Sequence, residues 1–87
     1  MKLHTLKIKY KYFEQVLRGN KRFELRYNDR DFQKDDLIHF VDEHGKEYDY
    51  FDTNLFKITY VLKGKDAEQY GLQEGYCIIS IAELCHN

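Results

Sequence analysis

Lys21, Glu24 and Arg26 are the side chains most able to do chemistry, and they lie in one stretch, Gly19–Tyr27, where charged and apolar residues alternate. This alternation predicts a strand. Successive side chains of a strand point to opposite faces, so Glu24 and Arg26 share one face and the apolar residues take the other. A lysine, a carboxylate and an arginine held together in this way can bind a polar, anionic ligand. The alternative is a surface ion pair of little energetic value, which spacing alone favours.

The segments before this stretch predict the elements that hold it in place. Leu6, Ile8 and Tyr10 alternate with lysines, which predicts a half-buried first strand. Apolar residues then recur at the spacing of a helix face, which predicts a helix over Tyr12–Arg18. Gly19 supplies a natural end for that helix.

The remainder of the chain is typical of short strands joined by turns. We expect loops at Asn28–Asp35 and Lys63–Gly75, the second with one helical turn at Asp66–Tyr70. About six short strands and one main helix predict an α+β fold, for which a nearly closed mixed β-barrel fits the pattern and an open sheet fits nearly as well. Beyond the first two strands, the expected strands are Leu37–Val41, Lys46–Phe51, Phe56–Leu62 and Tyr76–Ile81.

Composition limits both the size of the protein and its partners. With 87 residues there is room for one domain, which we place at residues 1–87. The 14 basic and 15 acidic residues leave a net charge of -1, which excludes the strongly basic class of nucleic-acid-binding protein. Any RNA contact should therefore be local. Basic residues gather in the N-terminal part and acidic residues further on, which predicts either two sides of opposite charge or a mixed, solvated surface.

Metal-dependent and covalent chemistry are not predicted. The two cysteines and four histidines lack the spacing of metal ligands, so we expect no metal and no cofactor. Cys77 is expected to be a small buried residue, and His4 to face the site from the first strand. Ser80 is the only serine, and no nucleophile–His–acid set can be assembled. Neither a signal peptide nor a long apolar span is found, so we expect a cytoplasmic protein.

Two further segments supply candidate binding residues. Arg30 lies in the polar loop after the central strand, close enough in sequence to line the same site. Glycines near the last strand allow close approach to a ligand, and Tyr76 is placed to stack on a base. Glu74 is a candidate general base or base-edge acceptor. Alternatively, the Asn and Asp residues of the polar loop only hydrogen-bond their own backbone, and Tyr76 only packs at the edge of the core.

The spacing Gly-x-Lys-x-x-Glu-x-Arg, which begins at Gly19, resembles the signature of the ASCH domain, a branch of the PUA-like superfamily. The resemblance covers nearly the whole chain and extends to a small subfamily of phages and bacteria with no firmly assigned function. It implies a small PUA-like β-barrel with a cleft beside the signature that binds RNA or a nucleotide-like ligand. The further stretches that carry it are His4–Ile8, Tyr12–Glu14, Asn28–Phe32 and Gly71–Tyr76.

With this resemblance, the favoured function is binding of RNA or a nucleotide-like ligand by a monomer. The expected ligand-binding residues are Lys21, Glu24, Arg26, Arg30 and Tyr76. A further, lower-ranked possibility is a phage-encoded module that binds a host protein, with a charged cleft whose role is only structural.

The main alternative to binding is a hydrolase that acts on a modified nucleoside or on RNA in the same cleft. ASCH relatives that remove the acetyl group of acetylcytidine use a lysine, a threonine and a glutamate. Lys21 matches the lysine, Glu24 stands where they have the threonine, and Glu74 is the candidate acid. Because a carboxylate is a poor substitute for a hydroxyl nucleophile, we expect no efficient deacetylation.

Overall fold

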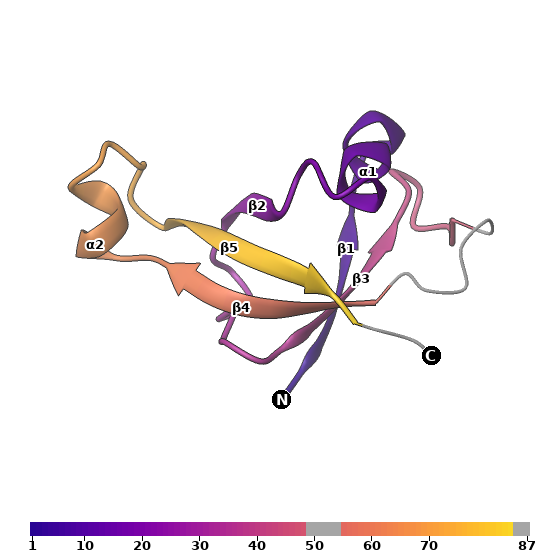
Figure 1. Cartoon of the computed structure of the whole chain (residues 1–87). Coiled ribbons are helices and arrows are strands. Elements are labelled where there is room, and N and C mark those ends of the chain that lie inside the picture. The colour runs from indigo at the N-terminus through magenta and orange to yellow at the C-terminus, as the bar shows by residue number, and fades with distance from the viewer. Residues whose placement is uncertain (49–54, 85–87) are drawn as a thin grey trace.

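The structure is a computed structural model and describes residues 1–48 and 55–84 (Figure 1). The two helices formed by these described residues lie at opposite ends of an elongated molecule that measures 39 × 27 × 23 Å. The elements in chain order are β1 (Leu3–Lys7), α1 (Tyr10–Leu17), β2 (Phe23–Tyr27), β3 (Leu37–Val41), β4 (Phe56–Leu62), α2 (Lys65–Glu68) and β5 (Tyr76–Glu83).

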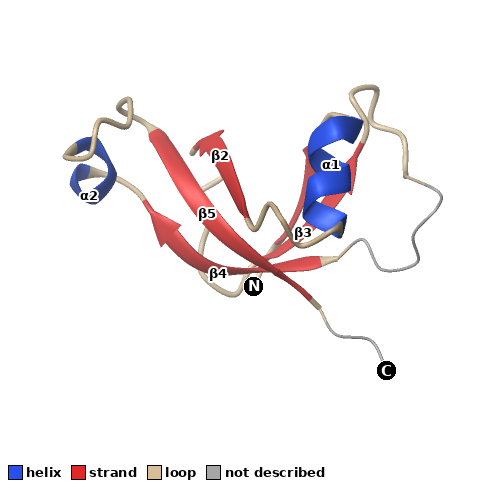
Figure 2. Cartoon of the chain, turned by 45° about the horizontal axis from the view of Figure 1, so that its top comes forward, coloured by secondary structure: helices blue, strands red, loops and turns tan. Residues whose placement is uncertain are grey.

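The five strands form one mixed sheet that curves into a half-barrel (Figure 2). The strand order is β1-β3-β4-β5-β2, so β1 and β2 are the two edges. β1 pairs with β3 in parallel, and the other pairs are antiparallel. A register shift between Ile58 and Tyr60 of β4 adds local bending. The sheet and the two short helices confirm the predicted α+β class.

The core lies in the hollow of the sheet, beneath α1. Phe13 of α1 is fully buried, stacks on Tyr48 with ring centroids 4.4 Å apart, and contacts Phe40 of β3 at 5.9 Å. Cys77 is completely buried, as expected, and burial raises the pKa of its thiol. Aromatic rings thus fill much of the small core, since each buries a large area per residue.

Several boundaries differ from the sequence prediction, and β5, for example, ends at Glu83 where Ile81 was predicted. The first strand ends at Lys7, because Tyr10 already begins α1 and is half exposed. The strand expected at Lys46–Phe51 is represented by a single bridge between Glu47 and Val41, and residues 49–51 lie outside the described residues. The described part of the chain therefore has five strands where about six were predicted. The expected helical turn after β4 is α2.

A buried hydrogen-bonded pair, His4 and Asp36, joins β1 to the residue before β3. The Nε2 atom of His4 donates to Oδ2 of Asp36 at 2.8 Å, and both residues are about 5% exposed or less. The backbone N–H groups of Lys2 and Gln33 also donate to this carboxylate. His4 therefore points into this pair and against Phe32, not toward the signature residues as we had expected.

Asp36 should make the protein sensitive to acid. Burial alone raises the pKa of the Asp36 carboxyl, but the hydrogen bonds from His4, Lys2 and Gln33 outweigh it and hold the pKa below its ordinary value of 3.8. A lowered folded-state pKa contributes stability that is present above the unfolded-state pKa and is lost as the pH falls through the folded-state value.

We expect Asp36→Asn to lower the free energy of unfolding at pH 7 by about 1–3 kcal/mol, because the charged acceptor is lost. The gap between the parent and the variant should narrow as the pH falls from about 5 to about 2. Urea denaturation across this range measures it. A gap that stays constant would show that the Asp36 charge does not stabilise the fold.

Candidate functional site

The register between β2 and β5 decides which side chains of β2 point inward. Glu24 lies opposite Ile79 and Arg26 lies opposite Cys77, and both of these β5 residues are fully buried. Directly opposed residues of an antiparallel pair project from the same face of the sheet. Glu24 and Arg26 therefore continue the inner face, and the apolar residues of β2 point to the outside.

Glu24 is the centre of a charged network. It is 5% exposed, and its two carboxylate oxygens accept hydrogen bonds from Lys21 Nζ at 2.6 Å and from Arg26 Nε at 3.1 Å. Lys21 Nζ also donates to the carbonyl of Phe23 at 2.8 Å. A buried carboxylate is tolerated only when it is paired and hydrogen-bonded, and here one anion has two cationic partners.

Two arginines connect the open edges of the half-barrel. Arg26 Nη2 donates to the carbonyl of Lys7 at 2.6 Å, and Arg30 Nη1 donates to the carbonyl of Thr5 at 2.7 Å. Both acceptors belong to β1, whereas Arg26 is in β2 and Arg30 follows it. Side chains thus join the two edge strands where the sheet has no backbone ladder.

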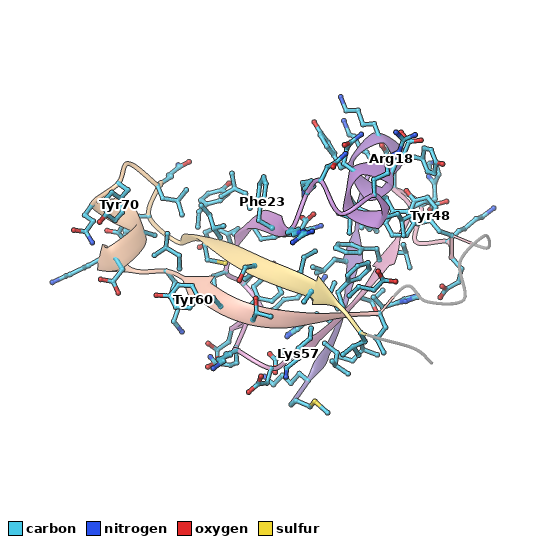
Figure 3. The ribbon with its side chains drawn as sticks, viewed as in Figure 1. Arg18, Phe23, Tyr48, Lys57, Tyr60 and Tyr70 are labelled. Atoms are coloured by element: carbon cyan, nitrogen blue, oxygen red, sulfur yellow. The ribbon has the colours of Figure 1, made fainter. Side chains whose placement is uncertain are left out.

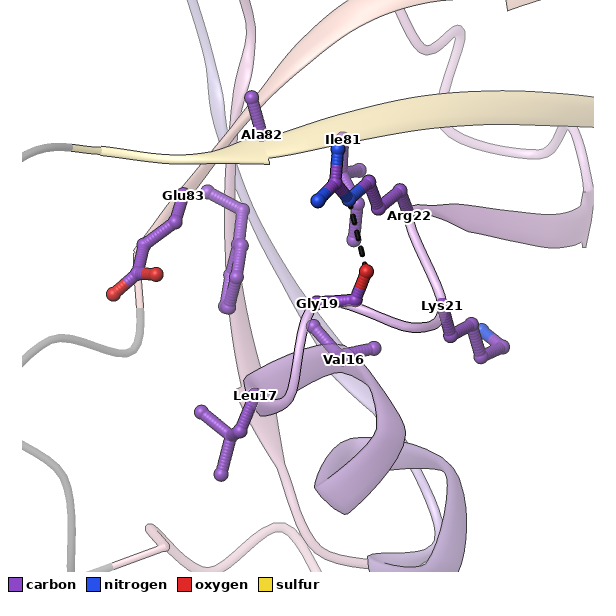
Figure 4. Close-up of a pocket in the computed structure, with 9 residues that line it drawn as sticks. Val16, Leu17, Gly19, Lys21, Arg22, Ile81, Ala82 and Glu83 are labelled. Atoms are coloured by element: carbon purple, nitrogen blue, oxygen red, sulfur yellow. Dashed lines mark hydrogen bonds between the residues drawn. The ribbon is translucent and has the colours of Figure 1, made fainter.

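The loop that delivers Lys21 is shaped by the end of α1. Gly19 adopts a positive φ of 76°, a conformation that glycine takes without strain. The backbone N–H groups of Asn20 and Lys21 both donate to the carbonyl of Gln15, which folds the chain back over the helix end. Arg22 Nε then donates to the carbonyl of Gly19 at 2.9 Å, as Figure 4 shows.

A small pocket of about 300 Å³ lies on one side of this loop (Figure 4). Val16, Leu17 and Ile81 contribute apolar surface to it, and the Arg22 side chain lies over it. In the same view the Lys21 side chain points away from Arg22, toward the other side of the loop. Lys21 contributes to the lining of both this pocket and the larger opening beside β2, so the loop lies between the two.

The larger opening, which we call the signature cleft, has a volume of about 680 Å³ and lies between β2 and the junction of β1 with α1. The side chains of Tyr12, Phe23, Leu25 and Tyr27 are 44–57% exposed there. In the view of Figure 3, Phe23 lies between Arg18, at the end of α1, and Tyr70, which follows α2. The lining residues are Lys7, Ile8, Lys9, Tyr12, Lys21, Phe23, Glu24, Leu25, Arg26, Tyr27 and Tyr76.

The structure brings most of the expected site residues together. Lys21, Glu24, Arg26 and Tyr76 all line the signature cleft. Arg30 does not, because its guanidinium is held against β1 by the Thr5 carbonyl.

Glu74 is exposed and is absent from the lining of the signature cleft, so it stands apart from Lys21 and Glu24. Side chains of the polar loop before β3 form hydrogen bonds within the loop itself: Asn28 Oδ1 accepts from the backbone N–H of Phe32, and Asp31 Oδ1 accepts from the side-chain amide of Gln33.

Sequence reasoning missed the aromatic and lysine side chains that complete the cleft. Phe23 and Tyr27 were assigned to the face opposite Glu24, but their exposure was not foreseen, because apolar strand residues are usually the buried ones. Lys7 and Lys9 were noted only as part of the basic N-terminal region. One signal was available in the sequence, the carboxylate of Glu24 between two cations. Because a charged network of this kind can occupy the inner face of β2, the apolar residues of the strand can be the exposed ones.

The comparisons with known proteins bear on the family and the fold. The sequence profile of a family described as Domain of unknown function (DUF3850) matches residues 3–81. The chain belongs to this family. A crystal structure described as hypothetical protein PH0355 is similar to it, with a TM-score of 0.60, 19% sequence identity, and coverage of 97% of this chain and 100% of that one. At this identity the similarity shows a shared fold alone. No curated protein matches the chain.

The described residues of this DUF3850 member lack both a metal-ligand cluster and a membrane-spanning helix. No group of three or more His, Cys, Asp or Glu side chains in residues 1–48 and 55–84 is placed to hold a metal ion. Over the same residues, no helix is long and apolar enough to cross a membrane.

We expect Glu24→Gln to lower the free energy of unfolding by about 1–3 kcal/mol. The amide replaces one acceptor oxygen with a donor, so either Lys21 or Arg26 loses its partner. Glu14→Gln is the matched control, because Glu14 pairs with Arg18 at 3.5 Å on the surface, where both side chains are 40% exposed or more. It should cost less than about 0.5 kcal/mol. Urea denaturation compares the two, and equal losses would contradict the structural role of the network.

Proposed function

We propose that the chain is an ASCH domain of the PUA-like superfamily and that it binds RNA or a nucleotide-like ligand in the signature cleft. The observation that best supports this proposal is the combination of exposed aromatic rings and positive charge in one cleft. Such a combination suits nucleic acid, because rings stack on bases and cations attract phosphates.

The charge of the cleft supports an anionic ligand. Its lining holds four basic residues, Lys7, Lys9, Lys21 and Arg26, and one acidic residue, Glu24. Local charge of this kind is compatible with a protein whose net charge is -1. It also attracts phosphate in a salt-dependent manner.

The network leaves hydrogen-bonding capacity for a ligand. Lys21 Nζ donates to Glu24 and to the Phe23 carbonyl, and a lysine ammonium carries a further N–H. Arg26 uses Nε and one N–H of Nη2, so most of its guanidinium donors remain. These side chains are 19% and 25% exposed, so a ligand in the cleft can reach them. Glu24 thus fixes two phosphate-binding groups in place.

The rings of the cleft support stacking. Tyr12 and Phe23 contribute exposed rings close to the basic residues, and the Lys21 ammonium lies 5.0 Å from the centre of the Phe23 ring. A cation beside a ring stabilises it electrostatically and leaves the other face open to a base. Stacking is tolerant of sequence, so we expect little base preference from these rings.

The combined variant Lys7→Gln with Lys9→Gln tests the proposal. Both side chains are exposed lining residues outside the network, so the fold should be unaffected. We expect several-fold weaker binding of a labelled RNA hexanucleotide in fluorescence anisotropy. The slope of log affinity against log salt should fall by about 0.7 for each lost phosphate contact.

The control removes the same charge elsewhere. Lys34 and Lys46 are exposed and do not line the signature cleft, so Lys34→Gln with Lys46→Gln should leave both affinity and salt slope close to those of the parent. Equal losses in the two double variants would mean that the cleft is not the RNA site. Absence of binding by the parent protein would refute the proposed function itself.

The proposal excludes efficient hydrolysis of acetylcytidine. Lys21 is bound to Glu24 and to a backbone carbonyl, both Glu24 oxygens are occupied, and Glu74 lies outside the cleft lining. A general base must reach the proton that it removes, and none of these groups is free to do so. We therefore expect no cytidine release by chromatography when the protein is incubated with acetylcytidine. Release that Lys21→Ala abolishes would replace the binding function with an enzymatic one.

A further inference from the structure

A second cleft adjoins the signature cleft at the end of β2. It has a volume of about 480 Å³ and lies where β2 ends, where β4 leads into α2 and where β5 begins. Each of the two clefts has the size of a small-molecule site. Its lining residues are Tyr27, Asn28, Lys63, Gly64, Asp66, Gly75 and Tyr76.

The two clefts share Tyr27 and Tyr76, which therefore form the boundary between them. The two rings pack edge to face with centroids 5.5 Å apart, and Tyr27 is 57% exposed. An exposed ring between two openings can stack on a base whose neighbouring phosphates lie on either side.

Gly75 allows the Tyr27 ring to take this place. A Cβ atom at Gly75 would lie 2.6 Å from Cε1 of Tyr27, which is closer than atoms approach. Gly75 also has a positive φ of 86°, which disfavours other residues. The backbone N–H of Asn28 donates to the Gly75 carbonyl at 2.8 Å, so the end of β2 is fixed against the start of β5. The absence of a side chain at Gly75 and its backbone conformation thus determine where the Tyr27 ring lies.

Positive charge lies on both sides of this ring pair. Lys7 and Lys9 line the signature cleft, and Lys63 lines the second cleft. Lys63 is exposed and makes no ion pair with the described residues. Asp66 is the one acidic residue of the second lining. The order along the surface is therefore cation, ring pair, cation.

We propose that the site takes a single-stranded oligonucleotide that crosses the Tyr27–Tyr76 pair from the signature cleft into the second cleft, rather than a free mononucleotide. This inference rests on the proposed function and extends it to the class of ligand. A strand repeats phosphate and base along its length, which matches the alternation of cations and rings. The two clefts lead from the junction of β1 with α1 to the junction of β4 with α2, and the helices lie at opposite ends of the molecule (Figures 1 and 2).

The test compares ligand lengths on the intact chain. Calorimetry with uridine monophosphate and with uridylates of two, four and six nucleotides should show affinity that rises with length until both clefts are filled. Lys63→Gln should weaken tetranucleotide binding several-fold, lower its salt slope by about 0.7 and leave mononucleotide binding unchanged. Lys65→Gln is the matched control, because Lys65 is exposed on α2 and lines neither cleft.

Tyr27 variants test the boundary itself. Tyr27→Ala should weaken tetranucleotide binding roughly 5- to 150-fold, the range for loss of one stacked base, and Tyr27→Phe should stay near the parent. Because Tyr27 is largely exposed, both variants should remain folded.

The outcomes separate the two proposals. Binding that does not depend on length, or equal effects of Lys63→Gln and Lys65→Gln, would overturn the extended strand and leave the proposed function standing. No binding at any length would overturn both.

Discussion

The structure around the site depends on one buried carboxylate. Glu24 lies on the inner face of β2, in line with fully buried residues of β5, where an unpaired charge would be strongly destabilising. Lys21, which precedes β2, and Arg26, which lies within it, both form ion pairs with the Glu24 carboxylate. Because Glu24 fixes both cations, their remaining donors are presented at a defined edge of the half-barrel. A charged network that is largely structural can in this way also prepare a binding surface.

Arg26 of this network and Arg30, which lies outside it, link the two edges of a half-barrel that does not close fully. β1 and β2 are the sheet edges, and exposed edges are prone to unwanted pairing. Arg26 and Arg30 reach carbonyls of β1, so side chains link the edges and leave an opening between them. That opening is the signature cleft. With the inner face of β2 committed to charge, its aromatic side chains turn outward and line the cleft.

Local pattern was sufficient to predict several elements from the sequence. The strands predicted at Leu37–Val41 and Phe56–Leu62 match β3 and β4, and alternation of charged and apolar residues marked the stretch that contains β2. The helix spacing around Phe13 and Val16 located α1 within two residues. Lys21, Glu24 and Arg26 were singled out by their spacing, and they do meet. The polar loop at Asn28 and the burial of Cys77 also followed from residue type.

What sequence could not predict depends on long-range register. The outward direction of Phe23 and Tyr27 follows from the pairing of β2 with β5, which no local pattern specifies. His4 was expected at the site from its place on the first strand, but its partner is Asp36, which lies far along the chain and which no local pattern connects to it. Lys63 joins Tyr27 in one cleft only through the fold. Arg30 was drawn away from the cleft by a backbone carbonyl, an acceptor that every residue carries and that no sequence pattern marks.

The most direct test of the central claim is a nuclear magnetic resonance titration of the labelled protein with a short single-stranded RNA. If the cleft around the Glu24 network is the binding site, the largest shift changes will fall on Phe23, Leu25, Tyr27 and Tyr76, which line it. The turn at residues 42–46 and the region of Lys57, which lie outside the cleft lining, will change little. Largest changes at that turn or around Lys57, with the cleft residues unmoved, would contradict the account.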